Sequence, residues 1–179
     1  MKDLSDEDLI LASAKGDKTC FAELTRRYSR RFFALTYRFF YTEQLANEVT
    51  QEIMLKIWLN AEKWDRSKGS AFSWMYKIAQ NKCIDEKRKI KNVEFSGLEE
   101  DYMMPDSTPN AEQKLRVKQE ASVVKKEMEH LPEKQKTAIS LFYFDELTMG
   151  EISDIMEINK KAVENLLVRA RKTLRERLA

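Results

Sequence analysis

The sequence predicts an all-α protein made of two small helical domains joined by a flexible acidic linker. Glycine and proline disfavour helix interiors, and the 179 residues contain only four glycines and three prolines. Residues that favour helices are abundant, and 42% of the chain is hydrophobic, which is enough to build cores. Apolar residues also recur at helical spacing. A chain of this length has room for one medium domain or two small ones.

One segment interrupts the helical pattern. Residues 93–113 contain two prolines, one glycine and six acidic residues, with no lysine or arginine. A long surface loop inside a single domain is the alternative, but unstructured loops longer than about 15 residues are uncommon there. We therefore favour a flexible linker between a domain over residues 1–92 and a domain over residues 114–179.

Periodicity in the first domain predicts four helices, over residues 6–15, 18–40, 43–63 and 70–90. The third helix has a core stripe made of Leu45, Val49, Ile53 and Ile57. A second side combines two carboxylates with two leucines: Glu48, Glu52, Leu55 and Leu59. This mixed face suits a protein partner. A domain that buries both faces is an equally good interpretation of the same pattern.

The fourth helix has a buried stripe made of Phe72, Met75, Tyr76, Ala79 and Cys83. Its opposite side carries Trp74, Lys77, Asn81 and Arg88. Aromatic and amide planes can stack on unpaired bases while cations hold phosphates, so this side suits unstacked bases. Trp64 and the polar turn DRSKGS precede the helix and suit a pocket for a flipped base. The alternative is that the aromatic residues are core and the cations are solvated.

In the second domain, helices are predicted over residues 111–131, 132–144, 148–157 and 159–178. Thr148 with Glu151 forms a capping box, and Asn159 caps the last helix. Two helices joined by so short a turn are typical of a helix-turn-helix, whose second helix lies in the DNA major groove.

The last helix is strongly basic, in a chain whose net charge is only +2. Its buried stripe is expected to contain Val163, Leu166, Leu167, Ala170, Leu174 and Leu178. The outward side carries Lys161, Asn165, Val168 and Lys172, flanked by Glu164, Arg169 and Arg175. An ordinary amphipathic helix with a solvated face is the alternative. The capped helix before it favours DNA recognition.

Several other functions are disfavoured by composition. Cys20 and Cys83 are isolated and the chain has one histidine, so we expect neither a zinc site nor a disulfide framework. No nucleophile signature accompanies His130, and we expect no catalytic residues, no cofactor and no small-molecule substrate. No apolar run approaches the ~20 residues of a membrane span, and the acidic start lacks a signal-peptide pattern. We expect a cytoplasmic protein.

Residues 131–178 resemble the fourth conserved region of bacterial RNA polymerase sigma factors, in particular the extracytoplasmic-function (ECF) group of the sigma-70 superfamily. The shared residues are the LP, Q, F, EI, V and RARK positions of this segment. ANEVTQEIMLKIW resembles the second region of the family, although Leu45 and Asn47 stand where acids are usual. FSWMYKIAQNKCIDEKR resembles the segment that melts and reads the minus-ten element.

The resemblance implies a region-two helical bundle, an acidic linker and a region-four helix-turn-helix domain. It implies polymerase binding through Glu48, Glu52, Leu55 and Leu59. For the minus-ten DNA it implies Trp64, Trp74, Lys77, Asn81, Lys82 and Arg88. For the minus-thirty-five DNA it implies Lys160, Lys161, Glu164, Asn165, Val168, Arg169 and Lys172.

The implied function is that of an alternative sigma factor, which joins core RNA polymerase and directs promoter-specific initiation. The implied partners are the clamp helices and flap of core polymerase, promoter DNA, and an anti-sigma factor that can hold the protein at the inner membrane without direct membrane insertion. Two other functions remain open at this point. A helix-turn-helix repressor or activator would act without polymerase, and a helical adaptor would bind no nucleic acid.

Overall fold

The computed structural model describes residues 4–94, 127–128 and 130–178. Within these ranges the regular elements are helices, as predicted, and they form two compact units that are described separately. The predicted linker, from residue 95 onward, and most of the helix predicted over residues 111–131 lie outside the described residues. None of the helices in the described part is long and apolar enough to span a membrane.

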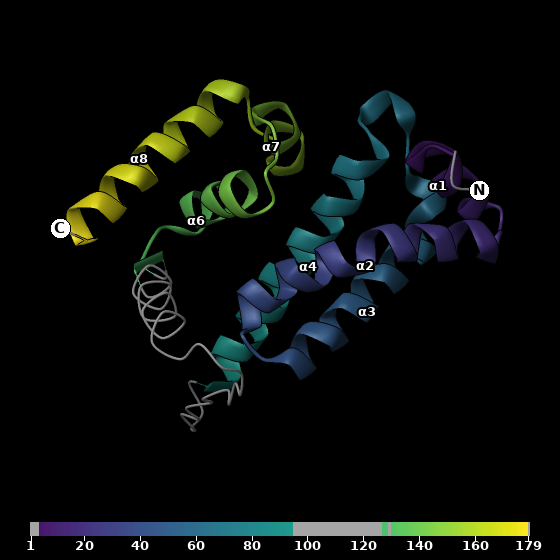
Figure 1. The fold of residues 1–179 in the computed structure, drawn as a ribbon, viewed down its shortest axis with the longest axis horizontal. Coiled ribbons are helices and arrows are strands. Elements are labelled where there is room, and N and C mark those ends of the chain that lie inside the picture. The colour runs from purple at the N-terminus through teal and green to yellow at the C-terminus, as the bar shows by residue number, and fades with distance from the viewer. Residues whose placement is uncertain (1–3, 95–126, 129, 179) are drawn as a thin grey trace, which may run out of the picture. The chain divides into compact units, whose positions relative to one another are not determined.

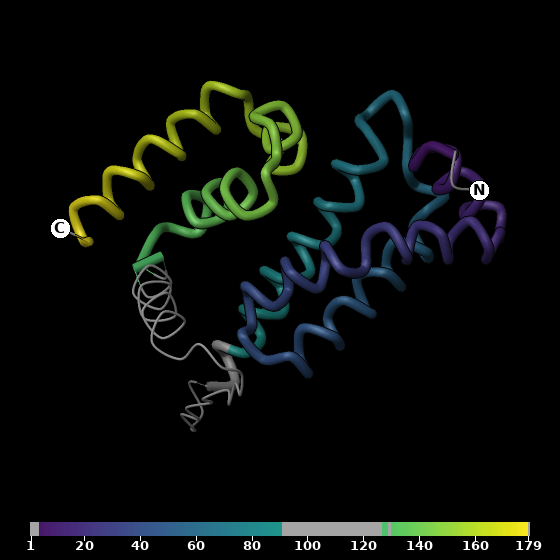
Figure 2. The backbone as a smooth tube through the Cα atoms, viewed as in Figure 1, coloured from purple at the N-terminus to yellow at the C-terminus, as the bar shows by residue number. Residues whose placement is uncertain are grey.

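The first unit contains four helices: α1 (Asp6–Ala14), α2 (Lys18–Phe40), α3 (Glu43–Asn60) and α4 (Ala71–Glu94). A two-residue connection makes α2 and α3 antiparallel neighbours, and α4 packs on both (Figure 1). The smooth backbone trace shows how α1 crosses one end of this group (Figure 2). These contacts bury most of the apolar stripes that the sequence predicts, although Leu45 and Phe72 are only half-buried.

Aromatic and hydroxyl side chains join the long helices of this unit. Phe32 of α2 lies edge-on to Tyr76 of α4, with ring centroids 5.5 Å apart, and both residues are fully buried. Between α2 and α3, the buried hydroxyls of Thr36 and Thr50 lie 2.9 Å apart, and both lie within hydrogen-bond distance of the Ala46 carbonyl. Each hydroxyl also has a carbonyl acceptor within its own helix, Phe33 for Thr36 and Ala46 for Thr50, so both buried groups are satisfied.

Two helix ends differ from the sequence prediction. The third helix was expected to reach residue 63, but α3 ends at Asn60 and continues as the 3₁₀ turn η1 (Ala61–Lys63). The Asn60 side-chain amide donates to the Lys56 carbonyl over 2.8 Å, an interaction that competes with regular helix. The fourth helix continues through Val93 and Glu94, so the first two residues of the predicted linker are helical.

The second unit contains α6 (Glu133–Ile139), the π-helical turn η3 (Ser140–Phe144), α7 (Met149–Met156) and α8 (Lys160–Leu178). Both α6 and α7 pack against α8. The core is formed by apolar residues of every element, including Leu141, Ile152, Val163 and Leu167. Within the stripe predicted for the last helix, Val163, Leu167 and Ala170 are buried, Leu166 and Leu174 are half-buried, and Leu178 is 45% exposed.

Candidate functional site

The outer side of α3 carries the predicted mixed face. Glu48 and Glu52 are exposed, and Leu55 and Leu59 are 56% and 61% exposed. Val49, Ile53 and Ile57 are buried on the opposite side, so the helix does not bury both faces. Large leucines at such exposure, beside two carboxylates, form a surface that can be desolvated by a partner while the acids select its charge.

The exposed side of α4 carries the groups predicted for melted DNA. Asn81 and Arg88 are exposed, whereas Trp74 and Lys77 are half-buried. The Arg88 guanidinium lies 3.9 Å from the Asp85 carboxylate. The side thus combines a partly accessible indole, an amide and an exposed cation along about four turns of one helix, which can contact both bases and phosphates.

Two residues predicted to contact minus-ten DNA are placed differently. Trp64 is only 6% exposed and packs into the core after η1, with its indole Nε1 unpartnered among the described residues. Lys82 is buried between α3 and α4, where its ammonium pairs with Glu52 and Glu86. The expectation of direct DNA contact placed both side chains on the surface. Their burial points instead to roles inside the unit.

The turn between Trp64 and α4 has a defined geometry. The Asp65 carboxylate accepts hydrogen bonds from the Ser67 hydroxyl and backbone, at 2.8 and 2.9 Å, and these bonds lower the pKa of Asp65. The short 3₁₀ turn η2 (Arg66–Lys68) follows, and Gly69 has a φ of 143°. Gly69 supplies a backbone conformation that other residues rarely adopt, and Arg66 and Lys68 are exposed beside it.

The helix pair of the second unit is held by its caps. Thr148 and Glu151 form the predicted capping box, with the Thr148 backbone donating to the Glu151 carboxylate over 2.8 Å. At the other end of α7, Glu157 has a left-handed φ of 54°, and the Ser153 hydroxyl donates to the Ile158 carbonyl over 2.5 Å. Asn159 then accepts from the Ala162 backbone over 2.8 Å, as predicted for a cap. The turn between the helices is therefore closed by hydrogen bonds on both sides.

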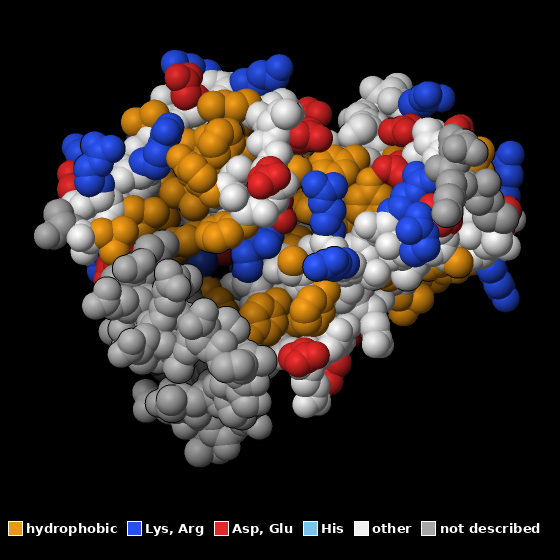
Figure 3. Space-filling model, viewed as in Figure 1, with side chains coloured by type: hydrophobic (Ala, Val, Ile, Leu, Met, Phe, Trp, Pro, Cys, Tyr) orange, Lys and Arg blue, Asp and Glu red, His pale blue; other side chains and the backbone are white. Residues whose placement is uncertain are grey.

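The predicted outward side of α8 is exposed in the structure. It comprises Lys161, Asn165, Val168 and Lys172. Lys160 and Arg169 are also exposed, and in the space-filling view lysine and arginine side chains follow the outer side of α8 (Figure 3). This side has cations at its edges and an amide and an apolar group between them. Such an arrangement fits phosphates at the rims of a groove and base edges at its floor.

One surface was not predicted from the sequence. The turn η3 leaves Tyr143 and Phe144 half exposed. The run SLFYF has more consecutive apolar residues than one buried stripe requires, and this excess is the signal that indicates an exposed apolar group. Single π-helical turns are rare and are often found at functional sites.

Comparison with known families identifies both units. Residues 24–93 match the family described as Sigma-70 region 2, and residues 123–174 match Sigma-70, region 4. Together the two matches include more than half of the chain. The order of the two regions along the chain is the order that the sequence resemblance predicts.

Curated relatives align with most of the chain. "ECF RNA polymerase sigma factor SigW" of Bacillus subtilis is 28% identical over 172 residues, covering 92% of this chain and 91% of that protein. "ECF RNA polymerase sigma factor RpoE" of Cereibacter sphaeroides is 28% identical over 137 residues, covering 76% of this chain and 74% of that protein.

Two solved structures have a similar fold. CnrH, in complex with the cytosolic domain of CnrY, superposes with a TM-score of 0.71 at 21% identity and covers 97% of this chain and 96% of its own. The sigma factor RpoE of Bartonella quintana, in complex with the anti-sigma factor NepR, has a TM-score of 0.64 at 17% identity and covers 88% of this chain and 96% of its own.

Proposed function

The chain belongs to the sigma-70 family, and from this membership we propose that it is an alternative sigma factor of the ECF group. In this role it is a noncatalytic subunit that joins core RNA polymerase and directs promoter-specific initiation. The observation that carries the proposal is the exposed basic side of α8, in a capped helix pair, on a chain that also contains a region 2 unit.

The mixed face of α3 serves core polymerase in this proposal. Leu55 and Leu59 supply apolar area, and Glu48 and Glu52 select a basic partner surface, which the family resemblance assigns to the clamp helices. In the second unit, the exposed rings of Tyr143 and Phe144 are suited to the polymerase flap. Apolar centres with charged margins are the usual composition of protein interfaces.

The exposed side of α4 handles the minus-ten DNA. Trp74 and Asn81 offer planes for unpaired bases, while Lys77 and Arg88 hold the adjoining phosphates. Trp64 supports the turn over residues 65–70 from the core, and Lys82 acts within the protein.

The outward side of α8 reads the minus-thirty-five DNA. Asn165 and Glu164 face base edges. The amide of Asn165 can pair with adenine, and the carboxylate of Glu164 can accept a hydrogen bond from the amino group of cytosine. Val168 offers an apolar contact to a thymine methyl group. The backbone is held by the cations of this side: Lys160, Lys161, Arg169 and Lys172.

We place the protein in the cytoplasm, where core polymerase acts, under the control of an anti-sigma factor. Anti-sigma factors cover the surfaces through which a sigma factor binds polymerase. The Bartonella quintana structure contains a sigma factor of similar fold in complex with an anti-sigma factor. The mixed face of α3 is the surface available to a protein partner of this type.

A repressor or activator acting without polymerase is disfavoured, because such a protein has no need of the region 2 unit. The deciding experiment mixes the purified chain with core RNA polymerase and promoter DNA. We expect the chain to co-purify with core polymerase. We expect transcription only when the chain, core polymerase and promoter DNA are all present. Tight binding of the isolated chain to promoter duplex, without any association with polymerase, would refute the sigma-factor function.

A further inference from the structure

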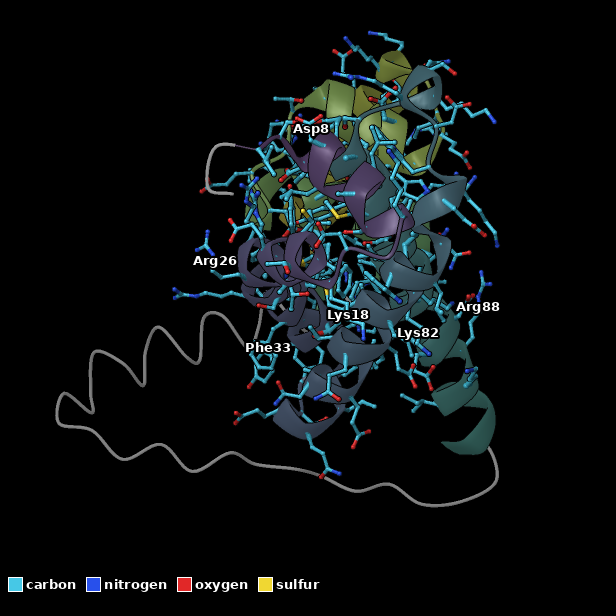
Figure 4. All side chains as sticks on the ribbon, turned by 90° about the vertical axis from the view of Figure 1, so that its right-hand side faces the viewer. Asp8, Lys18, Arg26, Phe33, Lys82 and Arg88 are labelled. Atoms are coloured by element: carbon cyan, nitrogen blue, oxygen red, sulfur yellow. The ribbon has the colours of Figure 1, made fainter. Side chains whose placement is uncertain are left out.

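One lysine ties the proposed polymerase-binding helix to the proposed DNA-melting helix. The Lys82 ammonium, on α4, forms ion pairs with Glu52 of α3 and, at 2.7 Å, with Glu86 of its own helix. Only 9% of the Lys82 side chain is exposed, against 54% for Glu52. Lys82 lies on the same side of the unit as Arg88, whereas Arg26 projects from another side (Figure 4).

The ion-pair geometry leaves part of Glu52 available to a partner. The Lys82 ammonium contacts Oε2 of Glu52, and a carboxylate has two oxygens that each accept hydrogen bonds. The second oxygen belongs to a half-exposed side chain on the mixed face, next to Leu55 and Leu59. Glu52 can therefore remain paired with Lys82 and still accept a hydrogen bond from a cation of polymerase.

The buried position of Lys82 is electrostatically balanced. Burial by itself would lower the pKa of Lys82, but the hydrogen bonds to Glu52 and Glu86 outweigh it and raise the pKa. Glu86 has a second cation, since the Lys89 ammonium lies 3.2 Å from it. Within the described residues, Lys82 is the one ion-pair partner of Glu52, so removing Lys82 releases the Glu52 side chain more than it releases Glu86.

We propose that Lys82 is a positioning residue of the polymerase-binding face, which holds the Glu52 carboxylate in the orientation that core polymerase recognises. The inference rests on the proposed function of the α3 face. An unrestrained glutamate on a helix surface samples several rotamers and loses this freedom on binding. The ion pair with Lys82 restricts these rotamers before the partner arrives, which lowers the entropic cost of association.

The experiment measures the affinity for core polymerase without DNA, so that contacts with nucleic acid cannot contribute. The variants are Glu52→Gln, Lys82→Met, their combination, and Glu86→Gln as the matched control from the same cluster. Methionine keeps the length of the lysine stem in a buried position without leaving a charge. Thermal unfolding of each variant checks that the helical unit remains folded.

We expect Glu52→Gln and Lys82→Met each to weaken binding on the order of tenfold, and the double variant to be no weaker than the poorer single one. Glu86→Gln should change the affinity less than about twofold, because it leaves the Lys82 to Glu52 pair intact. This non-additive pattern distinguishes positioning from a general loss of stability. Lys82→Arg, which can still reach Glu52, should recover most of the affinity.

Other outcomes would overturn the inference. If Glu52→Gln weakens binding and Lys82→Met does not, the α3 face still binds polymerase but Lys82 does not position Glu52. If Lys82→Met and Glu86→Gln weaken binding equally, the cluster acts through stability alone. If neither Glu52→Gln nor Lys82→Met has an effect while the chain still binds polymerase, Glu52 is not at the interface. Complete failure of the wild-type chain to bind would instead refute the proposed function.

Discussion

Lys161 donates to the Glu164 carboxylate over 2.7 Å on the outward side of α8. This hydrogen bond lowers the pKa of Glu164, so the carboxylate is charged and already partnered when the helix approaches DNA. The pair therefore places an anion among the cations that we propose hold the phosphates, where its carboxylate can accept a hydrogen bond from a base edge.

Asn165 should read one base pair of the minus-thirty-five element. Asn165→Ala removes an amide that can pair with adenine, and we expect a loss of about 1 to 3 kcal/mol confined to one position of the site. Transcription by the reconstituted holoenzyme from a promoter library randomised across this element measures the effect. An equal loss on every promoter of the library would show that Asn165 reads no base.

Lys161 should contribute to binding without regard to sequence. Lys161→Ala is expected to weaken binding to all promoters alike. It should also reduce the slope of log affinity against log salt concentration by about one unit. The measurement is a salt titration of holoenzyme binding to several promoter duplexes. Lys18→Ala, an exposed lysine at the start of α2, is the matched control and should leave the slope unchanged. A slope unaltered by Lys161→Ala would remove this residue from the phosphate contacts.

The exposed leucines of α3 should matter for association and little for folding. Replacing both Leu55 and Leu59 by alanine removes apolar area that is largely accessible in the free protein, so core-polymerase affinity should fall by about 1 to 3 kcal/mol. The free energy of unfolding should change by less than about 0.5 kcal/mol. Leu11→Ala, in α1 and 44% exposed, is the control and should leave polymerase affinity intact. A large loss of stability in the double variant would place these leucines in the core instead.

Trp74 and Asn81 should act after polymerase has bound. Trp74→Ala and Asn81→Ala are each expected to reduce open-complex formation by about 1 to 3 kcal/mol, the usual contribution of a stacked base. Permanganate reactivity of unpaired thymines reports the melted region, and binding of the holoenzyme to closed promoter DNA serves as the reference. Unaltered reactivity in both variants would show that the exposed side of α4 does not hold the open strand.

Acid should weaken a cluster of ion pairs within α2. The Glu23 carboxylate accepts from Arg26 and Arg27, which lowers its pKa to about 2, and Arg27 also reaches Asp6 at 2.8 Å. Because the pKa of Glu23 is lower in the folded state, its contribution is present above the unfolded pKa of about 4.5 and is lost as the pH falls toward 2. Urea unfolding between pH 5 and pH 2 should therefore show a steeper decline in the wild type than in Glu23→Gln. Identical pH profiles would exclude a role for this group.

Patterns that depend on one helix at a time were predicted correctly from the sequence. The two sides of α3, the capping box at Thr148 and the cap at Asn159 each follow from spacing along a single helix. The buried location of Lys82 did not follow, because its contact with Glu52 joins two helices and depends on their packing. The sequence does show that Lys82 and Glu86 are four residues apart, but ion pairs at this spacing are usually solvated.

Element ends and special turns also required the structure. The competition of the Asn60 side chain with the helix depends on a rotamer, and the π-helical turn η3 depends on how the apolar run is shared between core and surface. Trp64 was assigned to the surface because it adjoins a polar turn. Packing of η1 against α1 places it in the core instead.

The narrow buried stripe of α8 bears on how such a protein can diversify. Val163, Leu167 and Ala170 bind the helix to its own unit, and none of the residues proposed to read bases belongs to that set. Substitutions on the outward side can therefore accumulate without an accompanying change in the scaffold. A duplicated gene could acquire a new set of target promoters through a few exposed positions, and the same separation makes α8 a practical place to engineer orthogonal transcription.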